Sequence, residues 1–411
     1  MRIAIIGTGI SGLTCAHLLH RQHELTLFEA GEHVGGHTNT VTVRDAEGVA
    51  HRVDTGFIVC NRRTYPNFTA MLDRLGVALQ PSDMSLAVRS ETTGVEWNGH
   101  DIAGLFAQRR NLLSPSHHRM WWDILRFNRL SRGWLEADPA LSVREALAPH
   151  GFGERFRSHY LEPMCAAIWS MPYGGLDGFP MRFLARFLDN HGMNTVNDRP
   201  LWYTVAGGSA TYVEAILRPL SGRVHVRSPV RRVTRRPQGG VSVATDAGSE
   251  DFDEAIIAAH SDQALAMIAE PDAAERAVLG AIPYQPNTAV LHSDVSALPR
   301  LRRTWAAWNV RAGAAAQPAA VTYWSNRLQG LSTATPFLVS LNQAVDPQLV
   351  HGSYGYHHPL FTAAAPAAQA RHGELIRNRG ISCCGAYWRF GFHEDGVVSA
   401  LAVCERFGVR P

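Results

Sequence analysis

The chain has 411 residues, of which 45% are hydrophobic and 18% are charged, a composition that predicts a folded globular protein and excludes a disordered one. This length exceeds what a single hydrophobic core usually serves, so two closely packed domains are expected. The formal net charge of +3, from 39 basic and 36 acidic residues, is too balanced to favour nucleic-acid binding.

The basic residues are all arginine, and lysine is absent from the sequence. This absence excludes a lysine Schiff base, a lysine general base and the lysine of a P-loop. Six cysteines form no C-x-x-C pair, which favours a reducing cytoplasm. The N-terminus does not resemble a signal peptide, and no apolar stretch reaches the roughly 18 residues of a membrane span. A cytoplasmic location is therefore expected.

The first 30 residues predict a β-α-β unit. Arg2 to Ile6 reads as a buried strand, Leu13 to His20 as a helix, and Leu25 to Phe28 as a second strand. A G-x-G-x-x-G loop lies between the first strand and the helix, which is the context that makes this motif informative. Its residues are expected to bind a pyrophosphate at the helix N-terminus: Gly7, Gly9, Ile10, Ser11 and Gly12.

The second strand ends at Glu29, whose carboxylate is placed to accept hydrogen bonds from the adenosine ribose. Residues 86–200 are rich in Trp, Phe, Arg and His, with helical periodicity around 119–135. Residues 223–257 and 285–345 are β-like. Ala363 to Ala370 predicts a helix start or a loop, and residues 381–407 are glycine-rich and then helical.

A nucleotide-type pattern thus appears at the start, near 205–260 and at the tail of the sequence. The fold class that we predict is α/β, with a discontinuous Rossmann-like cofactor domain and an interleaved α+β substrate domain. The cofactor domain would comprise residues 1–85, 205–284 and 375–411, and the substrate domain residues 86–204 and 285–374.

Several further segments resemble the FAD-dependent amine oxidase and phytoene desaturase superfamily. Gly35-Gly36-His37-Thr38 follows the ribose acid as a second glycine pair, and Val53-Asp54-Thr55-Gly56 resembles a D-x-G segment. Val205 to Ser209 resembles the mid-chain glycine motif, and Val224 to Val233 the strand pair that contacts adenine. Cys384 to Gly396 resembles the C-terminal flavin motif.

This resemblance implies FAD as the cofactor. The residues that it adds to the expected FAD site are Gly35, Gly36, His37, Thr38, Gly56, Val230, Gly385, Tyr387, Glu394, Asp395 and Gly396.

A narrower resemblance spans nearly the whole sequence, to a bacterial subfamily usually described only as NAD/FAD-binding. It rests on Gly35 to Thr40, Trp169-Ser170, Trp305 to Asn309, Tyr323 to Asn326, His358-Pro359, Gly385 to Trp388 and Gly391 to Gly396. That subfamily tends to be encoded beside cyclopropane-fatty-acid synthase-like methyltransferases, and some relatives are implicated in desaturating methyl-branched acyl chains. The resemblance therefore implies a lipid methyltransferase as a partner.

Two departures from the superfamily argue against amine oxidase chemistry. Ala386 stands where amine oxidases often carry an acid, and His37 stands where they commonly carry arginine. Many of these oxidases also place a lysine near the flavin, and this sequence has none. Neither departure affects the expected binding of FAD.

Three functions remain open on the sequence. The first is an oxidoreductase that desaturates a lipid-like substrate, such as a methylated unsaturated fatty acyl chain, by hydride transfer to flavin N5. The segment Met120 to Leu130 could then lie at a bilayer surface, peripheral to the inner membrane. The second is an amine oxidase-type enzyme, with protoporphyrinogen oxidase-like chemistry as a variant. The third is a non-enzymatic FAD-binding partner of a methyltransferase.

The candidate catalytic groups are His393 and Glu394, which open the last helix beside the expected flavin. The candidate substrate pocket contains Trp169, Tyr323, Asn326, His358 and Trp388. No metal is expected, because His17, His20 and His23 read as a helix edge and His357 and His358 are adjacent in sequence, where side chains rarely converge on one ion.

Overall fold

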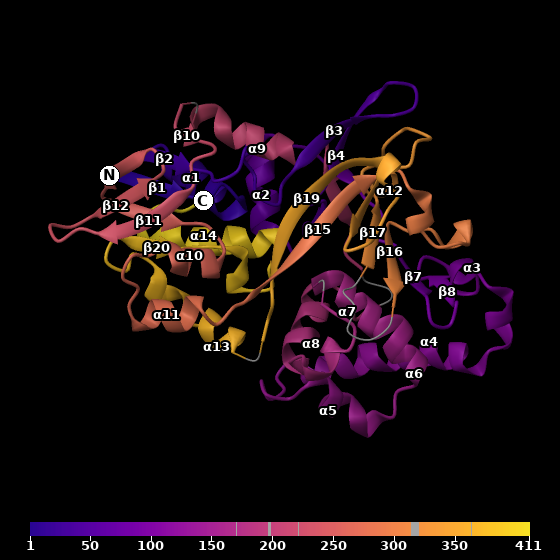
Figure 1. The fold of residues 1–411 in the computed structure, drawn as a ribbon. Coiled ribbons are helices and arrows are strands. Elements are labelled where there is room, and N and C mark those ends of the chain that lie inside the picture. The colour runs from indigo at the N-terminus through magenta and orange to yellow at the C-terminus, as the bar shows by residue number, and fades with distance from the viewer. Residues whose placement is uncertain (170, 196–198, 221, 314–319, 363) are drawn as a thin grey trace.

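The computed structural model describes residues 1–411 except 170, 196–198, 221, 314–319 and 363. Ser170 of the Trp169-Ser170 motif and Ala363 of the segment Ala363 to Ala370 therefore lie outside the described residues. The fold is α/β, as the sequence predicts. In Figure 1 the region with both termini lies at one end, and helices α4 to α8 lie below a large sheet at the other end.

The centre of the first region is a parallel five-stranded sheet assembled from distant segments. Its strands, in spatial order, are β10 (Val224–His225), β2 (Glu24–Phe28), β1 (Arg2–Ile6), β14 (Glu254–Ile257) and β20 (Ile381–Cys383). The carboxyl ends of parallel strands share one edge, so the loops after β1, β2, β14 and β20 converge there. Three segments that are far apart in sequence thus build one edge of the sheet.

Alternating side chains of β1 enter two different cores. Ile3 and Ile5 pack on the side covered by helices, and Ala4 and Ile6 pack on the opposite side. The helices are α1 (Ile10–Leu19), α2 (Pro66–Leu75), α9 (Ala210–Leu217) and α14 (His393–Arg406). The opposite side carries β11 (Val230–Arg235), β12 (Val241–Thr245), β13 (Gly248–Phe252), α10 (Ser261–Met267) and α11 (Ala273–Leu279).

A seven-stranded sheet forms the second region. Its order is β19 (Val350–Pro359), β15 (Tyr284–His292), β18 (Leu338–Leu341), β17 (Ala320–Trp324), β16 (Trp308–Ala312), β7 (Leu86–Ser90) and β8 (Glu96–Asn98). All pairs are antiparallel except β16 with β7. The helices around it are α3 (Ile102–Leu105), α4 (Pro115–Ser131), α5 (Val143–Leu147), α6 (Glu154–Phe156), α7 (Glu162–Trp169), α8 (Met181–Asn190) and α12 (Ser325–Leu328). Helix α13 (Ala365–Gln369) lies beside α11 in the first region (Figure 1).

Two small sheets lie between the regions. The hairpin β3 (Thr40–Arg44) and β4 (Ala50–Asp54) packs Val43 and Val53 on the seven-stranded sheet. Strand β9 (Trp202–Val205) pairs with β5 (Val59–Asn61) and β6 (Leu79–Pro81), not with the large sheet. Residues 202–204, expected in the substrate domain, thus pair with strands of the segment expected in the cofactor domain. The division into two domains stays a prediction.

Within the described part of the protein, no helix combines the length and the apolar character that crossing a bilayer requires.

Candidate active site

The loop after β1 leaves open space at its centre. A Cβ at Gly7, whose φ is +98°, would lie 2.5 Å from the Ala258 carbonyl oxygen, and a Cβ at Gly12 would lie 2.0 Å from the Gly7 carbonyl oxygen. These two glycines permit close packing of loop, strand and helix. Gly9 differs, because no atom lies within 4 Å of its Cβ position and its φ of −66° suits any residue. The loop therefore has room for a diphosphate at Gly9.

The first turn of α1 supplies the amides for this space. Gly9 is the N-cap and offers no side-chain cap, so the first amides of the helix lack partners of their own. Ile10 and Ser11 both line the adjoining cavity, and the Ser11 hydroxyl donates a hydrogen bond to the Gly396 carbonyl at 3.0 Å. Free amides at a helix N-terminus, with about half a positive charge, bind phosphates.

Glu29 lines the same cavity at the end of β2. Its carboxylate accepts hydrogen bonds from the Thr8 amide at 3.1 Å and from the Gly31 amide at 2.8 Å, and a further short one from the Thr8 hydroxyl. No sequence signal marks Thr8, because it occupies a variable position of the glycine motif. Thr8 holds the carboxylate against the loop, on the side where a ribose would lie.

The second glycine pair packs on the first loop. A Cβ at Gly36 would lie 3.0 Å from the Gly9 Cα, and a Cβ at Gly35 would lie 2.4 Å from the Thr38 carbonyl oxygen. Both glycines have positive φ, at +60° and +134°. Gly36 and His37 line the cavity, whereas Gly35 and Thr38 shape the turn behind it.

A cavity of about 870 Å³ extends from this loop to the large sheet and to α7 and α8. It is at the upper end of the range, roughly 300–1,000 Å³, in which proteins bind sizeable ligands. Of the residues predicted for the cofactor and the substrate, those that line it are Gly7, Gly9, Ile10, Ser11, Glu29, Gly36, His37, Gly56, Val230, Gly385, Tyr387, His393, Trp169, Tyr323 and His358.

Glu394 does not face this cavity. Its carboxylate accepts hydrogen bonds from the Asn67 amide at 3.1 Å, the Asn67 side chain at 2.6 Å and the Phe68 amide at 2.9 Å. It therefore caps the N-terminus of α2, where a negative charge is stabilised by the helix dipole. The expectation that Glu394 acts as a base or contacts the flavin is corrected: it joins α14 to α2.

His393 lines the cavity, but its imidazole is already engaged. The ring stacks on Phe57 with 3.5 Å between centroids, and Nε2 lies 2.9 Å from the Thr38 hydroxyl and 3.1 Å from the Tyr212 hydroxyl. Burial lowers the pKa of His393 to about 3, so the ring is neutral at pH 7. Its Nε2 is therefore a member of a buried hydrogen-bonded group, which does not favour a catalytic base.

Asp395 and Gly396 act within the last helix. Asp395 accepts hydrogen bonds from the Phe390 amide at 3.2 Å and the Phe392 amide at 2.9 Å, closing the turn that precedes α14. A Cβ at Gly396 would lie 2.6 Å from Ile10 Cγ2, so this glycine lets α14 approach α1. Both residues shape the site from behind the cavity wall and do not line it.

Two predicted pocket residues lie elsewhere. Trp388 stacks on His372 with 4.1 Å between ring centroids. Asn326 donates to the Thr335 carbonyl at 2.8 Å and accepts from the Phe337 amide at 2.7 Å, which ties α12 to the strand that follows. Sequence proximity to motif residues suggested both positions. The Trp388 side chain packs on His372, and the Asn326 side chain closes a local turn. Neither residue lines the cavity, so the expectation that they belong to the substrate pocket is corrected.

Histidines that are distant in the sequence gather beside the phosphate loop. The His37 ring stacks on His358 at 5.7 Å and lies 6.3 Å from His260, and His357 lies 5.8 Å from His260. All four line the cavity. Burial lowers the pKa of His260 and His358 to about 4 and holds the pKa of His37 well below its usual value. A diphosphate beside them would favour their charged forms.

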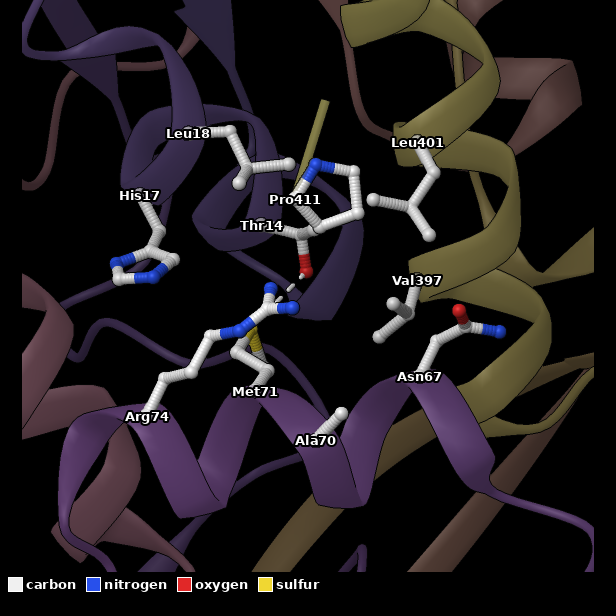
Figure 2. Close-up of a pocket in the computed structure, with 10 residues that line it drawn as sticks. All are labelled: Thr14, His17, Leu18, Asn67, Ala70, Met71, Arg74, Val397, Leu401 and Pro411. Atoms are coloured by element: carbon white, nitrogen blue, oxygen red, sulfur yellow. Dashed lines mark hydrogen bonds between the residues drawn. The ribbon is translucent and has the colours of Figure 1, made fainter. Parts of the chain in front are cut away.

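A second cavity, of about 50 Å³, lies among α1, α2, α14 and the C-terminus (Figure 2). It contains none of the predicted site residues and has room for a few water molecules only. His17 lines it together with Arg74 and Pro411. Across the described residues, no group of three or more His, Cys, Asp or Glu side chains is arranged to hold a metal ion.

The chain matches the family of flavin-containing amine oxidoreductases over residues 10–293, which is more than half of its length. It therefore belongs to this family of FAD-dependent oxidoreductases. The residues around Gly9, Glu29 and Gly36 fit that cofactor, because they leave space, free amides and a carboxylate in the required places. No curated protein sequence matches the chain.

Solved structures with the same fold include a fatty acid isomerase from P. acnes that produces CLA, with a TM-score of 0.69 and 16% identity over 99% of this chain and 98% of that one. Wild-type putrescine oxidase bound to putrescine has a TM-score of 0.69 and 14% identity over 99% of both chains. Cyclohexylamine oxidase from Brevibacterium oxydans has a TM-score of 0.64 and 16% identity over 99% of both chains. At these identities the likeness concerns the fold.

Proposed function

We propose that this oxidoreductase dehydrogenates a lipid-like substrate, such as a methylated unsaturated fatty acyl chain. The observation that carries the proposal is the chemistry of the cavity wall. Among the described residues that line it, Glu29 is the only carboxylate, and Thr8 and Gly31 already engage it. The wall near α7 and α8 is apolar and aromatic: Met164, Ala167, Ile168, Trp169, Phe187, Phe361 and Phe390.

An apolar wall of this kind suits an acyl chain, because removal of both surfaces from water stabilises the complex by roughly 25 cal/mol per Å². An amine would bring a positive charge, which burial disfavours unless a carboxylate or an aromatic cage compensates for it. The fold accommodates a fatty acid isomerase and a putrescine oxidase alike, so it does not separate these substrates. Because the described wall has no carboxylate free to pair with an ammonium group, it favours the acyl chain.

Bound FAD supplies an acceptor for the electron pair of a substrate C–H bond. The protein residues then have to orient that bond and exclude water. A C–H bond in the middle of a saturated acyl group is unactivated, whereas one beside an existing double bond is easier to break. A methylated unsaturated acyl group offers such an allylic position, and the aromatic wall would hold it in place.

The test is the anaerobic bleaching of the flavin in the purified full-length protein. We expect bleaching by phosphatidylglycerol that carries a monounsaturated, methyl-branched acyl group, and not by its saturated counterpart. Bleaching by putrescine or cyclohexylamine, without a response to the lipid, would instead establish an amine oxidase. A flavin-loaded protein that none of these compounds bleaches would support the non-enzymatic role beside a lipid methyltransferase.

An exposed surface on the substrate side supports a lipid. Leu113 is 90% exposed, Trp122 72%, Leu112 51% and Leu125 50%. On α4, positions 118, 122, 125, 129 and 132 follow the spacing of one helix face, and all are exposed. His118 at the top of this face donates a hydrogen bond to the Leu112 carbonyl at 2.8 Å, so the two leucines lie next to it.

The charges around this surface fit an anionic bilayer. Between residues 102 and 132 there are six arginines and a single acid, Asp123, which is buried and paired with Arg119 and Arg126. Met120, Ile124 and Phe127 form the opposite, core-facing side of the helix. Within the segment Met120 to Leu130, Trp122 and Leu125 are therefore the large apolar side chains that are exposed and could contact lipid. Arginines beside exposed tryptophan and leucine are typical of interfacial helices.

We expect the protein to bind vesicles of phosphatidylglycerol and to release them in high salt, because screening weakens the arginine contribution. Replacing Trp122 and Leu125 together by serine should weaken binding at least about 100-fold, since burial of each of these groups contributes roughly 1.5–3 kcal/mol. Val49→Ser, at a position 53% exposed on the β3–β4 hairpin, is the matched control. Sedimentation with vesicles measures this; equal binding by the double variant would disprove the surface.

A further inference from the structure

His191 occupies the apolar part of the cavity, and no sequence motif marks it. It is the residue after α8 and is 5% exposed. Its ring stacks on Phe187 with 4.1 Å between centroids and lies 5.3 Å from the Phe392 ring, immediately before α14. Phe392 belongs to the segment Cys384 to Gly396 that resembles the C-terminal flavin motif, so this contact places His191 beside that motif, and both residues line the cavity.

The tautomer of His191 follows from its hydrogen bond. Nδ1 lies 2.9 Å from the Phe187 carbonyl oxygen, which can only accept. Nδ1 therefore carries the proton, and in the neutral ring Nε2 has an open lone pair. Among the described residues no hydrogen-bond partner of Nε2 is found, and the ring lines the cavity. His393, by comparison, has its Nε2 between the Thr38 and Tyr212 hydroxyls.

The surroundings keep His191 neutral before the reaction. The rings packed on it are those of Phe187, Phe390, Phe392 and Tyr65. Tyr65 is the only titratable group among them, and burial raises its pKa well above the usual value. Burial disfavours the charged form of His191 as well, and for an imidazole this lowers the pKa, to about 4. No carboxylate contributes to that shift, so the lone pair is available at neutral pH.

We propose that Nε2 of His191 accepts the proton that the substrate loses on dehydrogenation, an assignment that rests on the proposed function. One substrate C–H bond would break, and its hydrogen would leave together with the electron pair as hydride, which bound FAD would accept. The neighbouring C–H bond breaks, its electrons form the new C=C bond, and its proton moves to Nε2. The imidazolium is short-lived, because burial disfavours its charge, and water removes the proton from Nε2.

The experiment compares His191→Gln with wild type in anaerobic flavin bleaching by the branched unsaturated phosphatidylglycerol. We expect the rate constant of bleaching to fall about 10²- to 10⁴-fold, the usual contribution of a positioned base. Flavin content and lipid binding should not change. In wild type the rate should fall as the pH drops from about 6 to about 4, where His191 becomes protonated, and this dependence should vanish in the variant.

His372→Gln is the matched control. His372 also bonds a backbone carbonyl, that of Cys383 at 2.9 Å, and stacks on an aromatic ring at 4.1 Å, and burial lowers its pKa to about 4. It does not line the cavity. Its replacement should leave the bleaching rate within about threefold of wild type, because it is remote from the proton that is transferred.

A second readout does not depend on activity. Nitrogen NMR of histidine-labelled, flavin-loaded protein should show His191 protonated at Nδ1 and bare at Nε2, with the signal assigned by its loss in His191→Gln. A ring protonated at Nε2 would overturn the assignment. Bleaching of His191→Gln at the wild-type rate, or an equal loss in His372→Gln, would do so as well. If the lipid fails to bleach the wild type, the proposed function itself fails, and the role of His191 fails with it.

Discussion

Replacing Gly9 by valine is expected to give a folded protein that retains no flavin. The backbone at this position is extended, with φ of −66°, so valine adds no strain there. No atom lies within 4 Å of the Cβ position, so the added carbons would project into the cavity. They would occupy the space that the diphosphate needs and would move it away from the amides of the first helical turn.

The size of this effect follows from the contacts that are lost. A hydrogen bond to a charged group contributes roughly 1.5–3 kcal/mol, so the loss of two weakens flavin binding at least about 100-fold. Absorbance of the purified protein and titration with FAD measure it. Gly373→Val, which also meets no neighbouring atom but lies outside the cavity, should stay yellow. A Gly9→Val protein with one FAD per molecule would contradict the assignment of the phosphate loop.

Replacing Asp54 by alanine is expected to cause the largest loss of stability among these changes. The carboxylate is fully buried and accepts hydrogen bonds from the Ser209 amide at 2.9 Å, the Thr40 hydroxyl at 2.5 Å and the Gln329 side chain at 3.1 Å. It thereby joins β4, the start of α9 and the end of α12. Alanine would leave these donors buried without acceptors, at a cost of about 3 kcal/mol in the free energy of unfolding.

The pH dependence of the Asp54 effect has a defined sign. Burial raises the pKa of Asp54 to about 6, so the folded state binds this proton more tightly than the unfolded protein does. Its contribution to stability is therefore complete below the unfolded pKa of about 4 and declines as the pH rises through about 6. Denaturant unfolding of wild type and Asp54→Ala at about pH 5 and about pH 8 should show the larger difference at the lower pH.

Asp246→Ala removes an exposed carboxylate that pairs with Arg231 and serves as the control, with little change expected. An Asp54→Ala protein as stable as wild type would show that the three segments are held together by other contacts. Because Gly56 follows Asp54 closely and lines the cavity, we also expect the variant to lose flavin more readily.

Local sequence was sufficient where a motif acts through its own backbone. The loop at Gly7, Gly9 and Gly12 and the acid at Glu29 lie as expected, because a strand, a glycine turn and a helix fix one another within a short stretch of sequence. The second glycine pair also reached the loop. The glycine at position 36 is itself a sign of close packing, because any Cβ there would crowd Gly9.

The sequence did not determine the direction in which several predicted site side chains point. Glu394 lies next to His393 in a flavin motif, yet one helix position turns its carboxylate to the N-terminus of α2. Asn326 and Trp388 likewise stand among motif residues but face local turns and packing. Adjacent residues on a helix point about 100° apart, so membership of a motif does not determine which of them meets a cavity.

The sequence by itself determined the nucleotide loop, the family of the protein and its cofactor, because these depend on short-range backbone geometry. Only the tertiary structure decided the composition of the substrate cavity. Residues such as His191, Phe57 and Met164 come from separate elements, and no pattern along the sequence encodes their meeting. Their arrangement depends on how two sheets and the helices between them pack, and that is set by contacts between residues distant in sequence.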